Sequence, residues 1–179
     1  MKIGIFGGTF DPWHLGHSAI VKAALKKVDK IIIVPTTCDY YRGNYLPLFS
    51  FDDRCTVIKE FMTGLDNVEL DTIEKDKDKN WRTYDTLKYF KEKFPNDELY
   101  LIIGEDSFAN FTTWFRYDDL LLMAKLLVAY RGVKVNVDLP HEMIDIGEGF
   151  VETSATSIRD KLKSELLDMY LSDKEWYND

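Results

Sequence analysis

The sequence predicts an α/β protein built on one doubly wound, parallel, Rossmann-like sheet. Three observations predict this fold: several short apolar runs have the composition of buried strands, helical patterns alternate with them, and glycine or proline follows several of the runs. Alternation of strands and helices is typical of parallel sheets that are covered on both faces. We expect a single domain over residues 1–179, because the chain has no internal repeat and no linker.

The first three predicted elements form one βαβ unit. Residues 2–6 have the apolar character of a buried strand, which ends in two glycines. A helix is expected from Asp11 toward Lys27, with Asp11 as its N-cap and Pro12 at its first position, where no amide hydrogen is needed. Residues 30–35 follow as a central strand that a proline ends.

The rest of the chain continues this alternation. The patterns predict helices over residues 51–62, 83–93, 118–124 and 156–169, and strands over residues 67–71, 98–103, 125–130 and 143–146. The mixed-charge run 74–80 is expected to be a solvated loop without a function. Ligands of doubly wound sheets bind at the carboxyl ends of the strands. The residues that follow the strands are therefore the candidates for function.

The charge balance excludes several classes of partner. With 31 acidic and 23 basic residues the net charge is -8, which disfavours binding to nucleic acid and to anionic membranes. Cys38 and Cys55 form neither a disulfide framework nor a zinc pattern. The sequence has no signal peptide and no apolar segment of about 20 residues. We therefore expect a cytoplasmic protein, and an anionic ligand must meet a local positive site.

The segment Gly7-Gly8-Thr9-Phe10-Asp11-Pro12-Trp13-His14-Leu15-Gly16-His17 carries the strongest functional signal. Its glycines let the backbone approach a ligand, and a helix N-terminus offers unpaired amides and about half a positive charge to a phosphate. His14 and His17 are three residues apart and therefore share one helical face. The segment indicates an anion site at which two imidazoles and a helix N-terminus converge.

Other functions fit these residues less well. A histidine is often only a partly buried hydrogen-bonding residue. A zinc site is disfavoured because no acidic residue lies between the two histidines and no cysteine or third histidine lies nearby. The chain also lacks the GxGxxG pattern of an NAD(P) oxidoreductase and the GxxxxGK[ST] pattern of a P-loop kinase. We expect no metal bound by protein residues alone.

A second segment rich in hydroxyl groups, Thr153-Ser154-Ala155-Thr156-Ser157-Ile158-Arg159, precedes the last predicted helix. Ser154 or Thr156 can cap that helix, and the remaining amides together with Arg159 would bind a second anion. Considered alone, this segment is better explained as an ordinary capped helix with a surface arginine.

The two segments resemble the nucleotide-binding signatures GGTFDPxHxGH and ISSTxIR of the bacterial nicotinate mononucleotide adenylyltransferases, which belong to the HxGH nucleotidyltransferase superfamily. Two further stretches are similar to family motifs: Arg82-Thr-Tyr-Asp-Thr-Leu87 to SYTxDTL, and Ile102-Ile-Gly-Glu-Asp-Ser-Phe-Ala-Asn-Phe-Thr-Thr-Trp114 to IIGADSLxxLxxW. The resemblance covers about residues 1–165. HxGH alone is shared with other adenylyltransferases and with cytidylyltransferases, so the four motifs together carry the specificity.

The resemblance implies a nucleotidyltransferase fold and a reaction of NAD biosynthesis. The phosphate of nicotinate mononucleotide would attack the α-phosphorus of ATP, giving the deamido dinucleotide and pyrophosphate. A phosphate monoester has a second pKa near ~6, so this nucleophile is ionised at pH 7 and needs no general base. Mg²⁺ that bridges the ATP phosphates is the expected cofactor.

The resemblance also implies roles for the matching residues. The catalytic residues would be His14, His17, Arg159 and Arg42. The residues that bind ATP would be Gly7, Gly8, Thr9, Phe10, Gly104, Asp106, Ser154 and Thr156. The residues that bind the mononucleotide would be Asp11, Thr86, Trp114 and Arg131. In this assignment Trp114 stacks on the flat, electron-poor pyridine ring, and Thr86 hydrogen-bonds the pyridine carboxylate.

The chain also departs from the family pattern. Residues 38–42 stand where the family often has a Pro-Pro-His-Lys loop, so Arg42 is expected to replace the lysine, and Ala155 replaces a serine of ISST. The tail 166–179 stays unassigned. Alternative functions are adenylyl transfer to nicotinamide mononucleotide or another phosphate acceptor, and a noncatalytic nucleotide-binding sensor. The sequence does not fix the oligomeric state, and a homo-oligomer is compatible with it.

Overall fold

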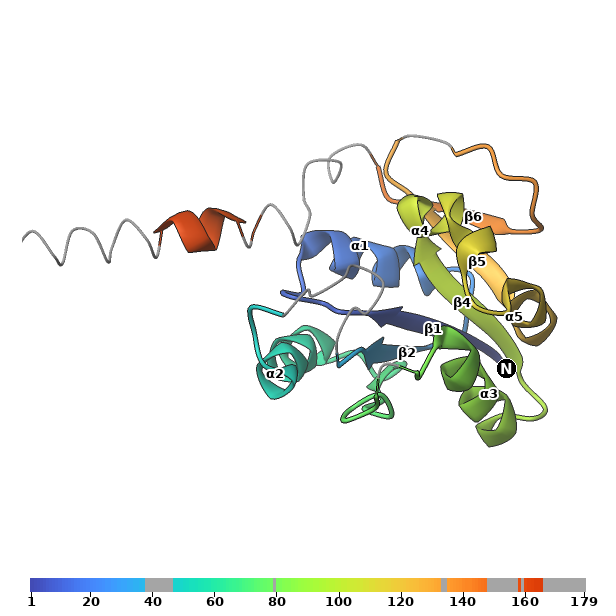
Figure 1. The fold of residues 1–179 in the computed structure, drawn as a ribbon, viewed down its shortest axis with the longest axis horizontal. Coiled ribbons are helices and arrows are strands. Elements are labelled where there is room, and N and C mark those ends of the chain that lie inside the picture. Colours follow the sequence, from blue (N-terminus) through green and yellow to red (C-terminus); the bar gives the residue numbers. More distant parts are fainter. Residues whose placement is uncertain (38–46, 79, 133–134, 148–157, 159, 166–179) are drawn as a thin grey trace, which may run out of the picture.

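The computed structural model describes residues 1–37, 47–78, 80–132, 135–147, 158 and 160–165. These residues form a six-stranded sheet with helices on both faces (Figure 1). The strands are β1 (Lys2–Gly8), β2 (Lys30–Pro35), β3 (Val68–Leu70), β4 (Glu98–Gly104), β5 (Lys125–Tyr130) and β6 (Glu142–Asp145). Their order is β3-β2-β1-β4-β5-β6, and all neighbouring strands are parallel. The predicted doubly wound parallel sheet is therefore confirmed.

The described helices are α1 (Leu15–Ala24), α2 (Phe51–Met62), α3 (Thr83–Lys93), α4 (Glu105–Ala109), α5 (Tyr117–Met123) and a 3-10 helix (Phe111–Thr113). The predicted bounds of α2 and α3 are confirmed at both ends. Helix α4 and the 3-10 helix were not predicted, because helices this short show no clear periodicity. Of the predicted helix 156–169, residues 158 and 160–165 are helical, and the rest lies outside the described residues.

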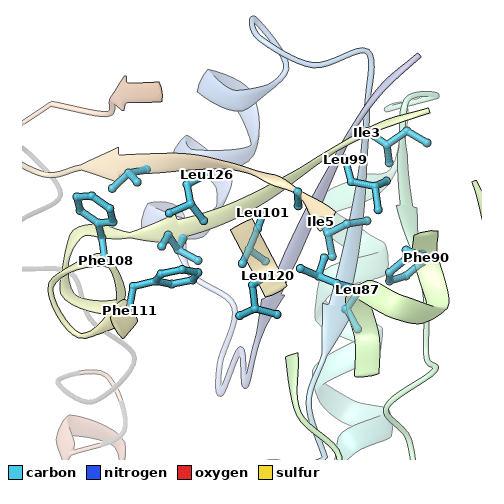
Figure 2. Close-up of a cluster of buried hydrophobic side chains, with 14 of the residues drawn as sticks. Ile3, Ile5, Leu87, Phe90, Leu99, Leu101, Phe108, Phe111, Leu120 and Leu126 are labelled. Carbon is cyan, nitrogen blue, oxygen red and sulfur yellow. The ribbon is translucent and has the colours of Figure 1, made fainter. Parts of the chain in front are cut away.

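One apolar core lies between the sheet and helices α3 and α5. Successive side chains of a strand point to opposite faces, so Ile3 and Ile5 of β1 enter this core together with Leu101 of β4. Leu87 of α3 and Leu120 of α5 cover them (Figure 2). Each such buried side chain stabilises the fold by about 1.5–3 kcal/mol.

A second core lies on the opposite face, under α1 and α2. Phe6 of β1 points into it, and Ile20 and Val21 of α1 and Ile58 of α2 pack against the sheet there. The chain leaves β1 on this face through α1, whereas it leaves β4 on the other face through α4 and α5. The order of the strands therefore reverses between β1 and β4, and their carboxyl ends form the topological switch point at which such sheets bind ligands.

Candidate active site

Helix α1 begins at the switch point, but three residues later than the sequence analysis expected. His14 is its N-cap, with an extended backbone, and the predicted N-cap Asp11 and first helical residue Pro12 precede the helix. The prediction was wrong because the carboxylate of Asp11 has other partners. It accepts hydrogen bonds from the backbone amides of Leu48 (2.8 Å) and Phe49 (2.9 Å), and the Asp11 side chain is completely buried.

His14 and His17 cap this helix reciprocally. Nδ1 of His14 accepts a hydrogen bond from the amide of Gly16 (3.1 Å), and Nδ1 of His17 accepts one from the amide of His14 (3.2 Å). The two rings stack with centroids 3.7 Å apart. A nitrogen that accepts a backbone hydrogen bond carries no proton, so the neutral ring is protonated at Nε2. Both imidazoles therefore have an Nε2 hydrogen to donate.

Burial keeps this pair of histidines uncharged. Burial, together with the nearby positive charge of Arg131, lowers the pKa of His14 from 6.5 to about 4. The pKa of His17 is lowered well below 6.5, first by burial and then by His14 and Arg131. Near pH 7 both side chains are thus neutral hydrogen-bond donors, and a bound anion would be the group that they stabilise.

The glycine between the two histidines has a steric reason. A Cβ atom on Gly16 would lie 2.9 Å from Cε1 and 3.0 Å from Nδ1 of His14, which is too close for two nonbonded atoms. A side chain at this position would push the imidazole away from its capping position. Gly16 therefore allows the ring of His14 to lie over the first turn of α1.

Arg131 lies beside His14. It directly follows β5, and its Nη2 atom is 3.7 Å from the place that a Cβ atom on Gly16 would occupy. Arg131 is one of the residues predicted to bind the mononucleotide. In the structure the positive charge of Arg131 lies close enough to His14 and His17 to lower the pKa of both. The mononucleotide would react through its own phosphate, which Arg131 could bind here. This role stays a prediction.

Aromatic residues support His17 from the second core. The ring centroids of Phe10 and Trp13 lie 5.0 Å and 5.1 Å from that of His17. Nε1 of Trp13 donates a hydrogen bond to Ser18 (2.9 Å). Phe10 has a positive φ of 49°, and the residue as a whole is 3% exposed. Its contact with ATP stays a prediction.

The other residues predicted to bind ATP lie at the ends of two adjacent strands. Gly7, Gly8 and Thr9 are at the end of β1, and Gly104 and Asp106 are at the end of β4. A Cβ atom on Gly104 would meet no atom within 4 Å, and the side chain of Asp106 is exposed. The topology thus brings these residues together, whereas their contacts with ATP stay predictions.

Glu105, between Gly104 and Asp106, was not singled out from the sequence. Within the described part of the chain, its Oε2 atom is buried without a hydrogen-bond partner. Burial and the negative charge of Glu105 raise the pKa of Tyr130 at the end of β5. A buried carboxylate oxygen thus lies between two residues of the predicted nucleotide site.

Thr86, which is predicted to bind the mononucleotide, has hydrogen-bond partners within the protein. Its hydroxyl donates a hydrogen bond to Oε1 of Glu74 (2.6 Å) and accepts one from Nε1 of Trp81 (2.8 Å). The residue is 3% exposed. Because a hydroxyl has a single proton, it cannot donate to a pyridine carboxylate while it is bonded to Glu74. In this arrangement the hydroxyl proton is used within the protein, and contact of Thr86 with the mononucleotide stays a prediction.

Glu74 also corrects the expectation that residues 74–80 are only a solvated loop. Its carboxylate accepts the hydrogen bond from Thr86, and its carbonyl accepts one from the hydroxyl of Thr37. Burial raises the pKa of Glu74, and hydrogen bonds from Thr86 and Thr36 act in the opposite direction. No pattern in the sequence indicates these contacts, because Glu74 begins a run of alternating charges that is typical of exposed loops.

Trp114 ends the 3-10 helix, in the loop that follows β4 and α4. Its ring lies 5.2 Å from that of Phe111, and it is partly buried against the first core. One side of the indole is therefore packed while part of the residue is accessible. Stacking on a pyridine ring stays a prediction that this position allows.

Four predicted site residues lie outside the described residues: Arg42, Ser154, Thr156 and Arg159. Their roles stay predictions. The residues that the structure does describe contain no group of three or more His, Cys, Asp or Glu side chains that could hold a metal ion. None of the helices in those same residues is long and apolar enough to cross a membrane.

Comparisons with known proteins show the family to which the chain belongs. Residues 5–161 match the family model described as cytidylyltransferase-like. The chain therefore belongs to the cytidylyltransferase-like family, which is the class that its parallel sheet and histidine motif define.

Curated relatives show to which family within this class the chain belongs. A Fusobacterium nucleatum protein named "Probable nicotinate-nucleotide adenylyltransferase" is 36% identical, over 92% of this chain and 89% of its own length. The nicotinate-nucleotide adenylyltransferase of Bacillus subtilis is 32% identical, over 95% and 90%. Within the class, the chain belongs to the nicotinate-nucleotide adenylyltransferase family.

A solved structure shows the same fold. The Plasmodium falciparum nicotinic acid mononucleotide adenylyltransferase, complexed with APC, has a TM-score of 0.68 with 21% sequence identity. The match covers 89% of this chain and 82% of the other. The predicted nucleotidyltransferase fold is thereby confirmed.

Proposed function

We propose that the protein transfers the adenylyl group of ATP to the phosphate of nicotinate mononucleotide and releases pyrophosphate. The observation that carries this proposal is the pair of stacked, neutral imidazoles at the switch point. The names of the relatives indicate nicotinate mononucleotide as the acceptor. The two imidazoles would stabilise the phosphate during transfer.

The two histidines suit hydrogen-bond donation better than proton abstraction. In each ring Nδ1 already accepts a backbone hydrogen bond, so the ring has no lone pair left to act as a base without breaking its cap. The proposed reaction requires no base, because the attacking phosphate is already ionised at pH 7. Nε2 of His14 and His17 would instead donate to the phosphate oxygens, on which negative charge is rearranged during transfer.

Arg131 would add a fixed positive charge at the same place. Its charge already acts on both histidines, so an anion bound next to them would also interact with the guanidinium. The turn after β1 and the end of β4 would hold the nucleotide so that the two phosphates meet in line. Trp114, on the opposite face of the sheet from α1, would contact the pyridine ring.

Mg²⁺ enters this proposal as part of the substrate MgATP. The described residues offer no cluster of three ligands for a metal. Mg²⁺ commonly retains water and binds through phosphates with only one or two protein carboxylates. The proposed site therefore fits an ion that arrives with the nucleotide better than one that the protein holds by itself.

The test is pyrophosphate release on mixing the protein with ATP, Mg²⁺ and nicotinate mononucleotide. We expect release that depends on all three and a dinucleotide product detected by mass spectrometry. The same assay with nicotinamide mononucleotide measures the acceptor preference, and equal or faster turnover of the amide would reject the acid as preferred acceptor. ATP binding without pyrophosphate release from any phosphate acceptor would favour a noncatalytic nucleotide sensor.

A further inference from the structure

Arg54 lies in the interior of the protein, on the face of α2 that packs toward the sheet. Its residue exposure is 2%, and it shares this face with Cys55 and Ile58. A buried guanidinium loses its water and needs hydrogen-bond acceptors of good geometry. No role for Arg54 is predicted from the sequence, because an arginine in a helix is usually exposed.

The guanidinium binds carbonyl groups from segments that are far apart in the sequence. Nη1 donates to the carbonyl of Thr9 (2.6 Å) and to that of Thr36 (2.8 Å). Nε donates to the carbonyl of Phe49 (3.2 Å), and Nη2 to that of Thr37 (3.4 Å). Arg54 thus joins the turn after β1, the residues after β2 and the residues that lead into α2.

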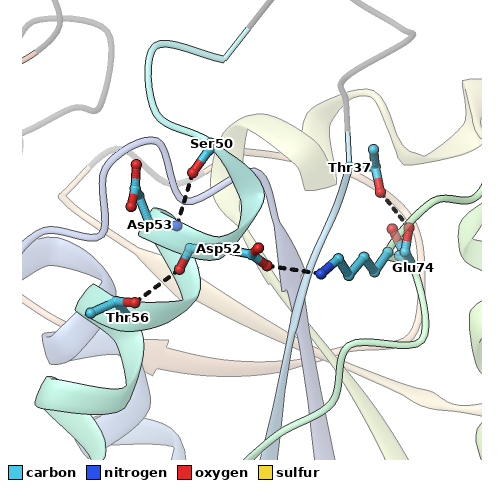
Figure 3. Close-up of polar contacts among 7 residues, drawn as sticks. Thr37, Ser50, Asp52, Asp53, Thr56 and Glu74 are labelled. Carbon is cyan, nitrogen blue, oxygen red and sulfur yellow. Dashed lines mark hydrogen bonds and ion pairs between the residues drawn. The ribbon is translucent and has the colours of Figure 1, made fainter.

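The same segments are held from their other side as well. The hydroxyl of Thr37 donates to the carbonyl of Glu74 (Figure 3), and the amide of Thr36 donates to the carbonyl of Gly8 (2.9 Å). The amide of Phe49 is bound by Asp11, while its carbonyl is bound by Arg54. Arg54 therefore completes a network that fixes these backbone groups in one orientation.

The contact with Thr9 has the clearest functional consequence. In a planar trans peptide the carbonyl and the next amide point in opposite directions. Because the carbonyl of Thr9 points at Arg54, the amide of Phe10 must point away from α2. Phe10 also has a positive φ of 49°, a conformation that is unfavourable for a residue with a side chain and needs support.

We propose that Arg54 is a positioning residue, which fixes the Thr9–Phe10 peptide so that its amide can bind an ATP phosphate. This inference rests on the proposed function, since it assumes that the turn after β1 contacts ATP. The planar fork of the guanidinium reaches several carbonyls together, whereas a lysine supplies the charge on one nitrogen. Lysine at this position therefore cannot replace arginine fully.

The test compares Arg54→Lys and Arg54→Gln with a matched control, Lys59→Met. Lys59 lies on the same helix but is exposed, so its loss removes a positive charge from α2 without touching the network. We measure the Kd of a nonhydrolysable ATP analogue by calorimetry at 10 °C, the melting temperature, and separate kcat and KM values for both substrates. Analogue binding requires no acceptor and no turnover.

We expect both Arg54 variants to fold and to bind the analogue about tenfold more weakly or worse, with a larger rise in KM for ATP than for the mononucleotide. Lys59→Met should match the wild type. Wild-type affinity in folded Arg54→Lys would overturn the proposal, and so would an unfolded Arg54→Lys, because the residue would then serve the scaffold alone. A wild-type protein that binds the analogue but releases no pyrophosphate would reject the proposed function and leave the binding result to decide on Arg54.

Discussion

Two polar regions of the molecule differ in whether their side-chain hydrogen-bond donors are bonded within the protein. At the start of α1, His14 and His17 each bind a backbone amide through Nδ1 and retain a proton on Nε2. In α3, the Thr86 hydroxyl is hydrogen-bonded to both Glu74 and Trp81. The first region has donors directed by the protein and available to a ligand, whereas the second uses its side-chain donors internally.

This difference separates residues that are predicted to contact a ligand from residues whose hydrogen bonds lie within the protein. The hydrogen bonds of the two histidines join residues at most three positions apart, so the spacing of the motif is enough to predict their geometry. The contact between Thr86 and Glu74 spans 12 residues, and it depends on how the loop before α3 folds back. A motif match therefore predicts the first region well and the second poorly.

The largest effect is expected when the histidine pair loses one donor. His17→Ala should lower the turnover number by about ten to a thousandfold, because a donor directed at the reacting phosphates is lost while the fold is retained. The measurement is the rate of pyrophosphate release, with circular dichroism to verify folding. The control is His141→Ala, since His141 contacts Leu139 and Tyr130 instead of α1. Near-normal turnover of folded His17→Ala would contradict the role of the pair.

A smaller effect is expected on stability in acid. His14 has a pKa of about 4 in the folded protein against 6.5 when it is unperturbed, so the unfolded chain takes up its proton first as the pH falls. The contribution of His14 is complete above pH 6.5 and is lost between pH 6.5 and about 4. Allowing for solvent screening, we expect a loss of about 2 kcal/mol.

The measurement is the free energy of urea unfolding at pH 7.5, 6 and 5, with His14→Asn as the matched variant. Asparagine retains a side-chain acceptor for the helix N-terminus but does not titrate. The stability of this variant should therefore fall less between pH 7.5 and 5 than that of the wild type. Parallel pH profiles would show that His14 is not the group responsible.

Much of the fold could be predicted because its elements have strong local signals. The apolar runs of β2, β4 and β5 and the periodicity of α2 and α3 were sufficient to place them. The start of α1 could not be placed, because Asp11 is a good N-cap by residue type and its true partners, Leu48 and Phe49, are 37 and 38 residues away. The prediction failed where a long-range contact competed with a local preference.

In the candidate site, too, local contacts could be predicted from the sequence and long-range contacts could not. His14 and His17 were predicted from their own segment, and the structure brings them together as expected. Arg54 and Glu74 could not be predicted from the sequence, because their hydrogen-bond partners are backbone carbonyls and hydroxyls that only the folded chain places nearby. A signal for Arg54 did exist, since it lies four residues before buried Ile58 on the same face of α2.

Trp114 lies on the same side of the sheet as Thr86, and its substitution tests whether a residue on that side contacts the mononucleotide. Trp114→Ala should raise the KM for the mononucleotide by about tenfold and the KM for ATP less, because stacking on a flat ring is worth roughly 1–3 kcal/mol. Trp114→Phe, which retains an aromatic face, should lose less. Equal increases in both KM values would indicate that the indole only packs against Phe111.

The smallest effect on catalysis is expected for Thr86. In Thr86→Val the indole of Trp81 and the carboxylate of Glu74 lose their partner, so stability should fall by about 1 kcal/mol. Thr86→Ser retains the hydroxyl and should recover most of this loss. If the Thr86 hydroxyl remains bonded to Glu74 when the mononucleotide binds, the ratio of kcat/KM for the acid and amide mononucleotides stays within twofold of wild type in both variants.

A tenfold change of this ratio in Thr86→Val alone would instead indicate that the Thr86 hydroxyl binds the pyridine carboxylate. The hydrogen bond from Thr86 to Glu74 would then have to break when the mononucleotide binds.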